Sequence, residues 1–251
     1  MKTFLKEIQL NETIILNYDE SDEISKAVFK RLFTLHETFQ KQGIDDTIFK
    51  ASIGDLENRF LKNLKSKGFL TLEEKDMKWI NMILDFKIFK LGSLRFQIFP
   101  MDYQEIERES FDEMLLNQKT KEIFYETRPL INMHIEKDTE LSPKAVDDAL
   151  TKARAFFTNV FSDIKFDGFV CRTWLIHPGV VSLLNPNSNI ARFARRFEII
   201  AENKATYQAL ARVYQTEDLN RIKDLPKVSS MEKTIYKNIE KLGVAFGFIP
   251  F

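Results

Sequence analysis

Hydrophobic residues recur every three to four positions through the first 90 residues, a spacing that turns one face of an α-helix towards a core. This pattern predicts amphipathic helices over residues 21–42 and 52–67. Thr71 and Glu74 have the spacing of a capping box, so we expect a third helix from there to about Lys90. The N-terminal part of the chain is therefore predicted to be mainly helical.

Beyond residue 90 the pattern changes, because segments with alternating or continuous hydrophobic residues now separate the helical ones. We expect strands at residues 93–99, 130–135, 168–176 and 244–251. Ser142 followed by Pro143 suits the start of a helix, with serine as the cap and proline in the first turn. The apolar stripe of that helix runs to about residue 161.

Further elements complete the second half of the chain. Residues 197–202 and 206–214 are predicted to pair as a hairpin, and Ser229 is placed to cap a last helix. Interleaved strands and helices indicate an α/β (α+β) fold, with helices on the faces of a mixed sheet. No linker is evident, and we expect a helical N-terminal domain over 1–90 and a sheet-containing domain over 91–251.

Composition narrows the class of protein. Lys plus Arg and Asp plus Glu are both 37, and this zero net charge argues against a nucleic acid or an acidic membrane surface as partner. A single cysteine, Cys171, allows no internal disulfide, and we expect no metal site. The N-terminus carries charges too early for a signal peptide, and no apolar run approaches the length of about 18 that spans a membrane. We therefore expect a cytoplasmic protein.

Four stretches of the second half carry a family resemblance: LGSLRF (91–96), His134-Ile135, FVCRTWLIHP (169–178) and LNPNSNIARFARRF (184–197). In this order and spacing they resemble the GNAT-like C-terminal domain of a bacterial acyltransferase family, in which a mainly helical N-acyltransferase domain comes first. The resemblance implies a GNAT-like sheet over 91–251 and an N-acyltransferase with acyl-coenzyme A as co-substrate. A small-molecule amine would be the acceptor and would attack the thioester directly.

The chain departs from this family's pattern in three places. The acidic stretch 136–140 stands where the family often has a proline and a glycine, and Arg172 stands where it usually has a histidine. No glycine-rich turn for a coenzyme A pyrophosphate precedes the helix that begins at Ser142. A second hypothesis therefore stays open, a non-catalytic module on the same fold that binds another small ligand or a partner subunit. As a third, the helical N-terminal stripes could bind a partner protein.

Candidate residues for proton transfer lie near the predicted strand ends. His134 could take a proton from an attacking amine, and Glu136 could do so through a water molecule. The alternative for His134 is a structural side chain bonded to a loop carbonyl. Tyr207 or Ser188 could supply a proton to the leaving thiolate.

The densest group of cations comprises Arg192, Arg195 and Arg196, with Asn189 nearby. On a helix Arg192 and Arg196 would share one face, and arginine forks bind phosphates well. These four residues are our candidates for binding the cofactor's phosphates. The alternative is a salt-bridged surface, with the acidic residues that follow the cluster as partners.

Arg172 and Trp174 alternate on one face of the predicted strand 168–176, so Trp174 could wall a substrate pocket with Arg172 at its rim. The alternative for Trp174 is a core side chain. Cys171, on the other face, is interpreted as a small core residue, and His177 as part of a loop.

Overall fold

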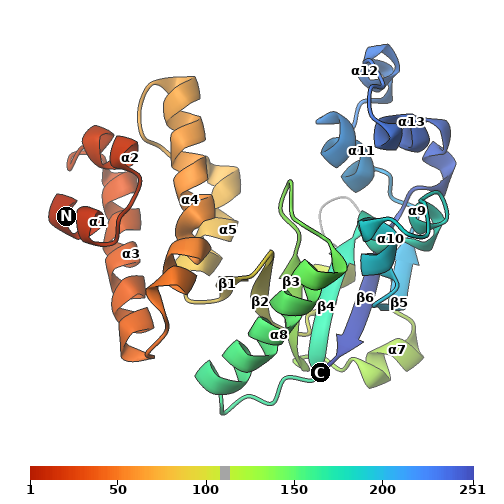
Figure 1. The fold of residues 1–251 in the computed structure, drawn as a ribbon, viewed down its shortest axis with the longest axis horizontal. Coiled ribbons are helices and arrows are strands. Elements are labelled where there is room, and N and C mark those ends of the chain that lie inside the picture. Colours follow the sequence, from red (N-terminus) through yellow and green to blue (C-terminus); the bar gives the residue numbers. More distant parts are fainter. Residues whose placement is uncertain (108–113) are drawn as a thin grey trace. The chain divides into compact units, whose positions relative to one another are not determined.

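The computed structural model describes residues 1–107 and 114–251, which form two compact units (Figure 1). Unit 1 is Met1–Gln97 and unit 2 is Ile98–Phe251. Among the described residues, no helix is long and apolar enough to cross a membrane.

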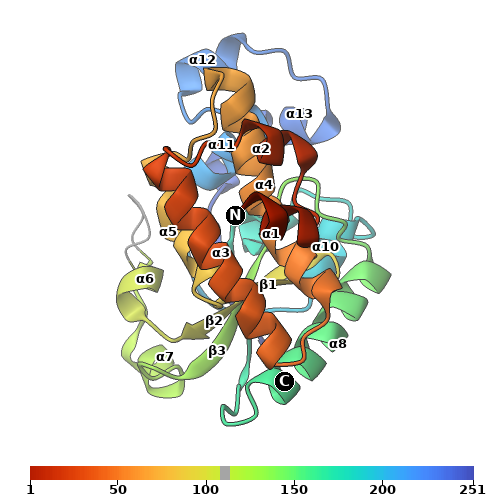
Figure 2. The ribbon, with the colours of Figure 1, turned by 90° about the vertical axis from the view of Figure 1, so that its left-hand side faces the viewer.

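Unit 1 is mainly helical, as predicted, and ends in a β-hairpin (Figure 2). Its elements are α1 (Lys2–Glu7), α2 (Glu12–Asn17), α3 (Glu23–Lys41), α4 (Asp46–Lys67), α5 (Glu74–Leu84), β1 (Ile88–Leu91) and β2 (Leu94–Pro100), which runs on into unit 2. Strands β1 and β2 pair antiparallel, with Leu91 opposite Leu94 across a turn at Gly92.

Phenylalanine forms much of the core of unit 1. The rings that are less than 2% exposed are Phe29, Phe39, Phe49, Phe60, Phe89 and Phe96. Phe39 meets the edge of Phe49 at 5.3 Å between centroids, a geometry worth roughly 0.5–1.5 kcal/mol beyond the buried area. The apolar stripes of α3 and α4 are therefore turned inwards, as their spacing predicted.

Two boundaries in unit 1 differ from the prediction. Helix α4 begins six residues early, at Asp46, because the Asp45 side chain caps it by accepting the Thr47 N–H at 2.7 Å. The third helix ends at Leu84, and Ile88–Leu91 forms β1 instead of a last helical turn. The predicted capping box at its start is also wrong, because Glu73 takes the N-cap position and makes no side-chain capping bond.

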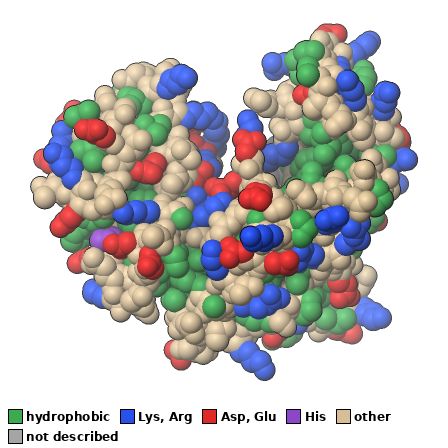
Figure 3. All heavy atoms as spheres, viewed as in Figure 1, with side chains coloured by type: hydrophobic (Ala, Val, Ile, Leu, Met, Phe, Trp, Pro, Cys, Tyr) green, Lys and Arg blue, Asp and Glu red, His purple; other side chains and the backbone are tan. Residues whose placement is uncertain are grey.

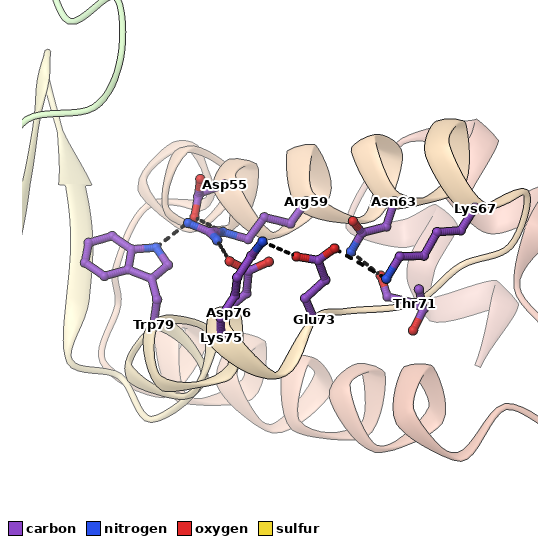
Figure 4. Close-up of polar contacts among 9 residues, drawn as sticks. All are labelled: Asp55, Arg59, Asn63, Lys67, Thr71, Glu73, Lys75, Asp76 and Trp79. Atoms are coloured by element: carbon purple, nitrogen blue, oxygen red, sulfur yellow. Dashed lines mark hydrogen bonds and ion pairs between the residues drawn. The ribbon is translucent and has the colours of Figure 1, made fainter. Parts of the chain in front are cut away.

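A polar stripe joins α4 to α5 and to the segment between them (Figure 4). Its α4 residues lie four apart: Asp55, Arg59, Asn63 and Lys67. Arg59 contacts Asp55 and Asp76, and the Trp79 indole N–H donates to Asp55 at 2.7 Å. Farther along, Asn63 donates to the Thr71 carbonyl at 2.9 Å, and Lys67 pairs with Glu73 at 3.4 Å. Charged and amide groups therefore fasten this side of α5, while Ile80, Ile83 and Leu84 bury its other side.

Unit 2 alternates strands with helices. Its elements after β2 are α6 (Tyr103–Glu107), α7 (Gln118–Ile123), β3 (Pro129–His134), α8 (Pro143–Val160), β4 (Gly168–Thr173), the 3-10 turn η1 (Trp174–Ile176), α9 (Pro178–Val181), α10 (Asn189–Ala194), β5 (Glu198–Asn203), α11 (Tyr207–Tyr214), α12 (Leu219–Asp224), α13 (Ser230–Lys237), η2 (Ile239–Lys241) and β6 (Val244–Pro250). Its sheet has the strand order β3-β4-β6-β5. Strand β3 is parallel to β4, whereas β6 is antiparallel to both β4 and β5, which confirms the mixed α/β fold.

Helices flank both faces of this sheet. Arg154 of α8 lies over the Phe169 ring at 5.3 Å, so α8 covers the face that Phe169 shares with Cys171 and Thr173. On the opposite face, Phe124 at the end of α7 meets the Phe248 ring at 5.1 Å. Val170, the residue paired with Phe248, and Arg172 therefore face away from α8.

The helix starts predicted for unit 2 are confirmed, but two strand predictions are wrong. Ser142 caps α8, and Ser229 forms a complete capping box with Glu232 at α13. Strand β4 ends at Thr173, because the Thr173 hydroxyl accepts the Leu175 N–H at 3.3 Å and begins η1. Residues 206–214 are not a hairpin strand but lie in α11, whose buried residues Ala209, Leu210 and Tyr214 have helical spacing.

Candidate functional site

The C-terminal ends of β3 and β4 bring two candidate residues to one edge of the unit 2 sheet. The parallel register pairs Ile131 with Phe169 and Asn132 with Val170. His134 and Arg172 lie two residues beyond the Asn132–Val170 pair, so both occupy the sheet face opposite α8. Both side chains are half-buried. The predicted face for His134, away from Ile131, is confirmed.

The connection from β3 to α8 forms a tight turn where the sequence lacks glycine. The Glu136 carbonyl accepts the Thr139 N–H at 3.3 Å and the Thr139 hydroxyl at 2.8 Å. Asp138 adopts a left-handed φ of 62°, a conformation that glycine favours and aspartate tolerates. The turn therefore has a glycine-like backbone but carries acidic side chains.

The start of α8 is closed by its own cap. The Ser142 side chain accepts the Ala145 N–H at 3.3 Å, and its hydroxyl donates to Glu140 at 2.7 Å. A carboxylate beside the first turn complements the positive end of the helix dipole. An anionic ligand at this helix end would therefore have to approach close to Glu140.

Gln208 links Trp174 to Tyr207, two candidate residues from separate elements. Trp174 is the first residue of η1 and is 7% exposed, which supports a largely core position for its ring. The Trp174 backbone N–H donates to the Gln208 Oε1 atom at 3.2 Å, and Gln208 Nε2 donates to the Tyr207 hydroxyl oxygen at 3.4 Å. Because β4 ends at Thr173, Trp174 does not share a strand face with Arg172, contrary to the sequence prediction.

The arginine cluster divides into exposed and paired members. Asn189 opens α10 behind the Ser188 cap, and Arg192 lies in its last turn. Asn189, Arg192 and Arg195 are exposed. Helix α10 ends at Ala194, so the predicted helical pairing of Arg192 with Arg196 does not form.

Arg196 instead contacts α8. Its Nη1 donates to Asp147 Oδ1 at 2.5 Å, and its Nη2 donates to the Pro143 carbonyl at 3.4 Å. The hydrogen bond from Arg196 holds the pKa of the Asp147 carboxyl below its ordinary value. The carboxylate that faces Arg196 therefore comes from α8, not from the acidic residues after the cluster.

His177 is more buried than a loop residue usually is. Its side chain fills the space between Gly179 and Gly243, and the Nδ1 atom has no hydrogen-bond partner among the described residues. Burial lowers the pKa of this imidazole, while Glu202 and the Asn203 backbone oppose the shift. The arrangement favours neutral histidine in a structural position.

The surroundings of the site are partly apolar. Figure 3 shows hydrophobic side chains gathered on unit 2 next to α11. Outside residues 108–113, no group of three or more His, Cys, Asp or Glu side chains is placed to hold a metal ion.

Sequence reasoning missed three residues of the site. Gln208 lay in a segment predicted to be a strand, and its partner Trp174 is 34 positions away. Asp147 was only one of the polar positions on α8, and its contact with Arg196 spans 49 positions. The left-handed Asp138 could have been suspected, because aspartate is among the few residues that tolerate this conformation.

Comparison with known proteins gives a family match and several similar folds. The sequence matches the family model of a GNAT-like C-terminal domain over residues 88–248. A solved acyltransferase in complex with decanoyl-CoA and teicoplanin has a TM-score of 0.70 at 15% identity, covering 99% of this chain and 87% of that one. An acyltransferase mutant in complex with octanoyl-CoA has a TM-score of 0.65 at 18% identity, covering 88% of this chain and 64% of that one.

A third solved structure, an acyltransferase in complex with decanoyl-CoA, has a TM-score of 0.67 at 16% identity. The match covers 88% of this chain and 63% of that protein. This chain thus spans less than two thirds of two of these three proteins. At such identities the likeness concerns the fold. A search of curated protein sequences found no match.

Proposed function

Since the chain belongs to the family of GNAT-like C-terminal domains, we propose that it transfers an acyl group from an acyl-coenzyme A to an amine. The observation that carries the proposal is the parallel pair β3 and β4, whose C-terminal ends hold His134 and Arg172 on one face. The similar folds support it, because those proteins were solved in complex with octanoyl-CoA or decanoyl-CoA. One of them also holds teicoplanin, which supports a small-molecule acceptor.

In the proposed reaction the amine nitrogen attacks the thioester carbonyl carbon, forming a C–N bond as the C–S bond breaks. His134 accepts the proton that the amine loses, with Glu136 acting through a water molecule as the alternative base. Tyr207 gives a proton to the departing thiolate, and a backbone N–H near the end of β3 stabilises the oxyanion. Arg172 borders the substrate side of this edge, and the largely buried Trp174 anchors Gln208 next to it.

The backbone of the turn before α8 suits a coenzyme A pyrophosphate, but the acidic side chains of this turn do not. The Glu136–Thr139 turn before α8 supplies the left-handed residue that a phosphate turn uses, at Asp138. Its acidic side chains and Glu140 oppose a pyrophosphate. We therefore assign the phosphates chiefly to Arg192 and Arg195, with Asn189 as a polar neighbour. Arg196 is available to them only by exchange with Asp147.

A thermal-shift experiment tests the proposal. The purified protein is heated with coenzyme A, acetyl-coenzyme A, octanoyl-coenzyme A or decanoyl-coenzyme A. A ligand at 100 times its dissociation constant adds about 2.7 kcal/mol to the free energy of unfolding, which gives a measurable rise in Tm. We expect a rise that depends on the acyl chain, a smaller rise for Arg192→Gln, and no change for Arg221→Gln, an exposed arginine of α12.

The acidic turn before α8 favours a second candidate function, a non-catalytic binding module. Glu136, Asp138 and Glu140 would repel phosphates, and a fold alone does not guarantee acyl transfer. If no acyl-coenzyme A raises Tm at millimolar concentration, the acyltransferase proposal fails and the module is favoured. Release of coenzyme A thiol above the uncatalysed rate with any amine excludes the module.

A further inference from the structure

The side-chain amide of Gln208 is held between η1 and α11. Its oxygen accepts the Trp174 backbone N–H at 3.2 Å, and its nitrogen donates to the Tyr207 hydroxyl oxygen at 3.4 Å. Trp174 directly follows β4 and is 7% exposed, so the anchor of this amide is a buried part of the sheet edge. Gln208 and Tyr207 are themselves half-buried at the start of α11.

These contacts fix which way the amide points. A backbone N–H can only donate, so the Gln208 oxygen must face Trp174. The amide nitrogen, which can only donate, is then turned towards Tyr207. The Tyr207 oxygen accepts this bond, so its own proton must point to a different acceptor. The direction of the hydroxyl proton therefore follows from a hydrogen bond made at the end of β4.

We infer that Gln208 is a positioning residue that directs the Tyr207 hydroxyl proton away from itself, so that Tyr207 can donate it to the leaving thiolate. The inference rests on the proposed acyl transfer and deepens it. As the acceptor nitrogen bonds to the acyl carbon, the C–S electron pair goes to sulfur and the Tyr207 proton follows it. The amine's proton goes to His134 and then to solvent, and Tyr207 regains a proton from solvent. The products are an amide and free coenzyme A thiol.

Gln208→Glu separates this role from simple packing. The variant keeps an oxygen for the Trp174 N–H but replaces the amide NH₂ with a second acceptor. The Tyr207 proton would then point at the carboxylate instead of the thiolate. Gln208→Met removes both bonds at similar size, and Gln104→Glu, an exposed change on α6, controls for the added charge. Melting curves establish that each variant is folded.

The assay uses decanoyl-coenzyme A as donor and hydroxylamine as a small amine acceptor, and measures released thiol. General-acid catalysis contributes roughly 10²–10⁴-fold, and we expect kcat to fall about 100-fold in Gln208→Glu with KM for the donor unchanged. The kcat of Tyr207→Phe should fall by the same factor, and the variant that combines Tyr207→Phe with Gln208→Glu should lose no more kcat than either single variant. Gln104→Glu should match the wild type.

A decanoyl thioester of nitrothiophenol supplies the decisive readout. Its thiolate leaves without protonation, so the wild type and Gln208→Glu should turn it over at rates within about threefold of each other. An equal loss with both donors, or undiminished kcat with decanoyl-coenzyme A, overturns the role of Gln208 while acyl transfer stands. A wild type without turnover of any thioester overturns the proposed function, and this inference with it.

Discussion

Replacing Arg128 with methionine should destabilise unit 2 by about 3 kcal/mol, because several interactions converge on its guanidinium. The Nε atom donates to Asp167 at 2.7 Å, and the two side chains are 15% and 33% exposed. A second nitrogen donates to the Ile123 carbonyl at 2.9 Å. The guanidinium also lies over the Phe124 ring at 4.7 Å and the Phe248 ring at 5.4 Å.

The magnitude follows from these contacts. A hydrogen bond to a charged group contributes about 1.5–3 kcal/mol, and a cation–π contact at a partly exposed position about 0.5–1 kcal/mol. Two such hydrogen bonds and two such contacts would add to about 4–8 kcal/mol. Because both charged side chains are partly exposed, neighbouring contributions do not add fully and methionine keeps part of the packing, we expect a net loss of about 3 kcal/mol. For a protein of this size, 1 kcal/mol lowers Tm by about 2–4 °C, which gives a fall of about 6–12 °C.

The assay is thermal unfolding followed by circular dichroism, with an exposed ion pair as the control. Lys152 pairs with Asp148 at 2.8 Å, but their side chains are 57% and 50% exposed. Such a pair on a helix contributes about 0.3–0.5 kcal/mol, so Lys152→Met should lower Tm by no more than about 2 °C. Arg128→Lys keeps the positive charge but loses the planar guanidinium, so its fall in Tm should lie between those of Arg128→Met and Lys152→Met. Equal shifts for Arg128→Met and Lys152→Met would refute the reasoning.

Further predictions concern single positions. Burial lowers the pKa of His177 in the folded protein, so the unfolded protein takes up a proton first when the pH falls below the ordinary value of about 6.5. The contribution of neutral His177 to the free energy of unfolding is therefore complete above that pH and is lost as the pH falls further. His177→Gln should flatten the fall of Tm with decreasing pH in this range. Gly243→Ala would place a methyl group 2.1 Å from the Asn203 carbonyl oxygen and should lower stability by roughly 1–3 kcal/mol, measured by urea unfolding. In the same assay Gly54→Ala, where the methyl group meets nothing within 4 Å, should raise stability by about 0.5–1 kcal/mol. Asp138→Gly keeps the left-handed turn and removes an acidic charge that repels phosphates, so the Tm rise with coenzyme A should increase; an unchanged rise would mean that the Asp138 carboxylate does not act on the bound phosphates.

Elements with complete local signals could be predicted from the sequence. Ser142 and Pro143 start α8 because their cap and ring geometry act within one turn, and Ser229 starts α13 in the same way. The end of β4 could not be predicted, because Trp174 and the two residues after it are all buried. They continue the apolar run of the strand, and no change from strand to helical spacing of apolar residues marks the boundary. Only the Thr173 hydroxyl, bonded to Leu175, marks the change of backbone.

The site was predictable only where it depends on a single element. His134 could be placed at a strand end, and its face followed from alternation along β3. The partner of Arg196 could not be found, because Asp147 comes from a helix 49 positions earlier and depends on how α8 packs. The link between Trp174 and Tyr207 was also hidden, since it needs both the early end of β4 and a helix at Gln208. The chemical roles of His134, Glu136 and Tyr207 stay predictions.

The polar stripe on α4 has a consequence for tolerated changes in chain length. Each residue turns an α-helix by about 100°, so steps of four drift by about 40°, and the stripe winds slowly around α4. Asp55 and Arg59 thereby meet α5, while Asn63 and Lys67 meet the connection before it. One residue inserted between Arg59 and Asn63 would rotate the second pair by about 100° against the first. The segment from α4 to α5 could then keep its contacts with only one of the two pairs. We therefore expect α4 to tolerate an insertion at this point less well than the exposure of its surface suggests.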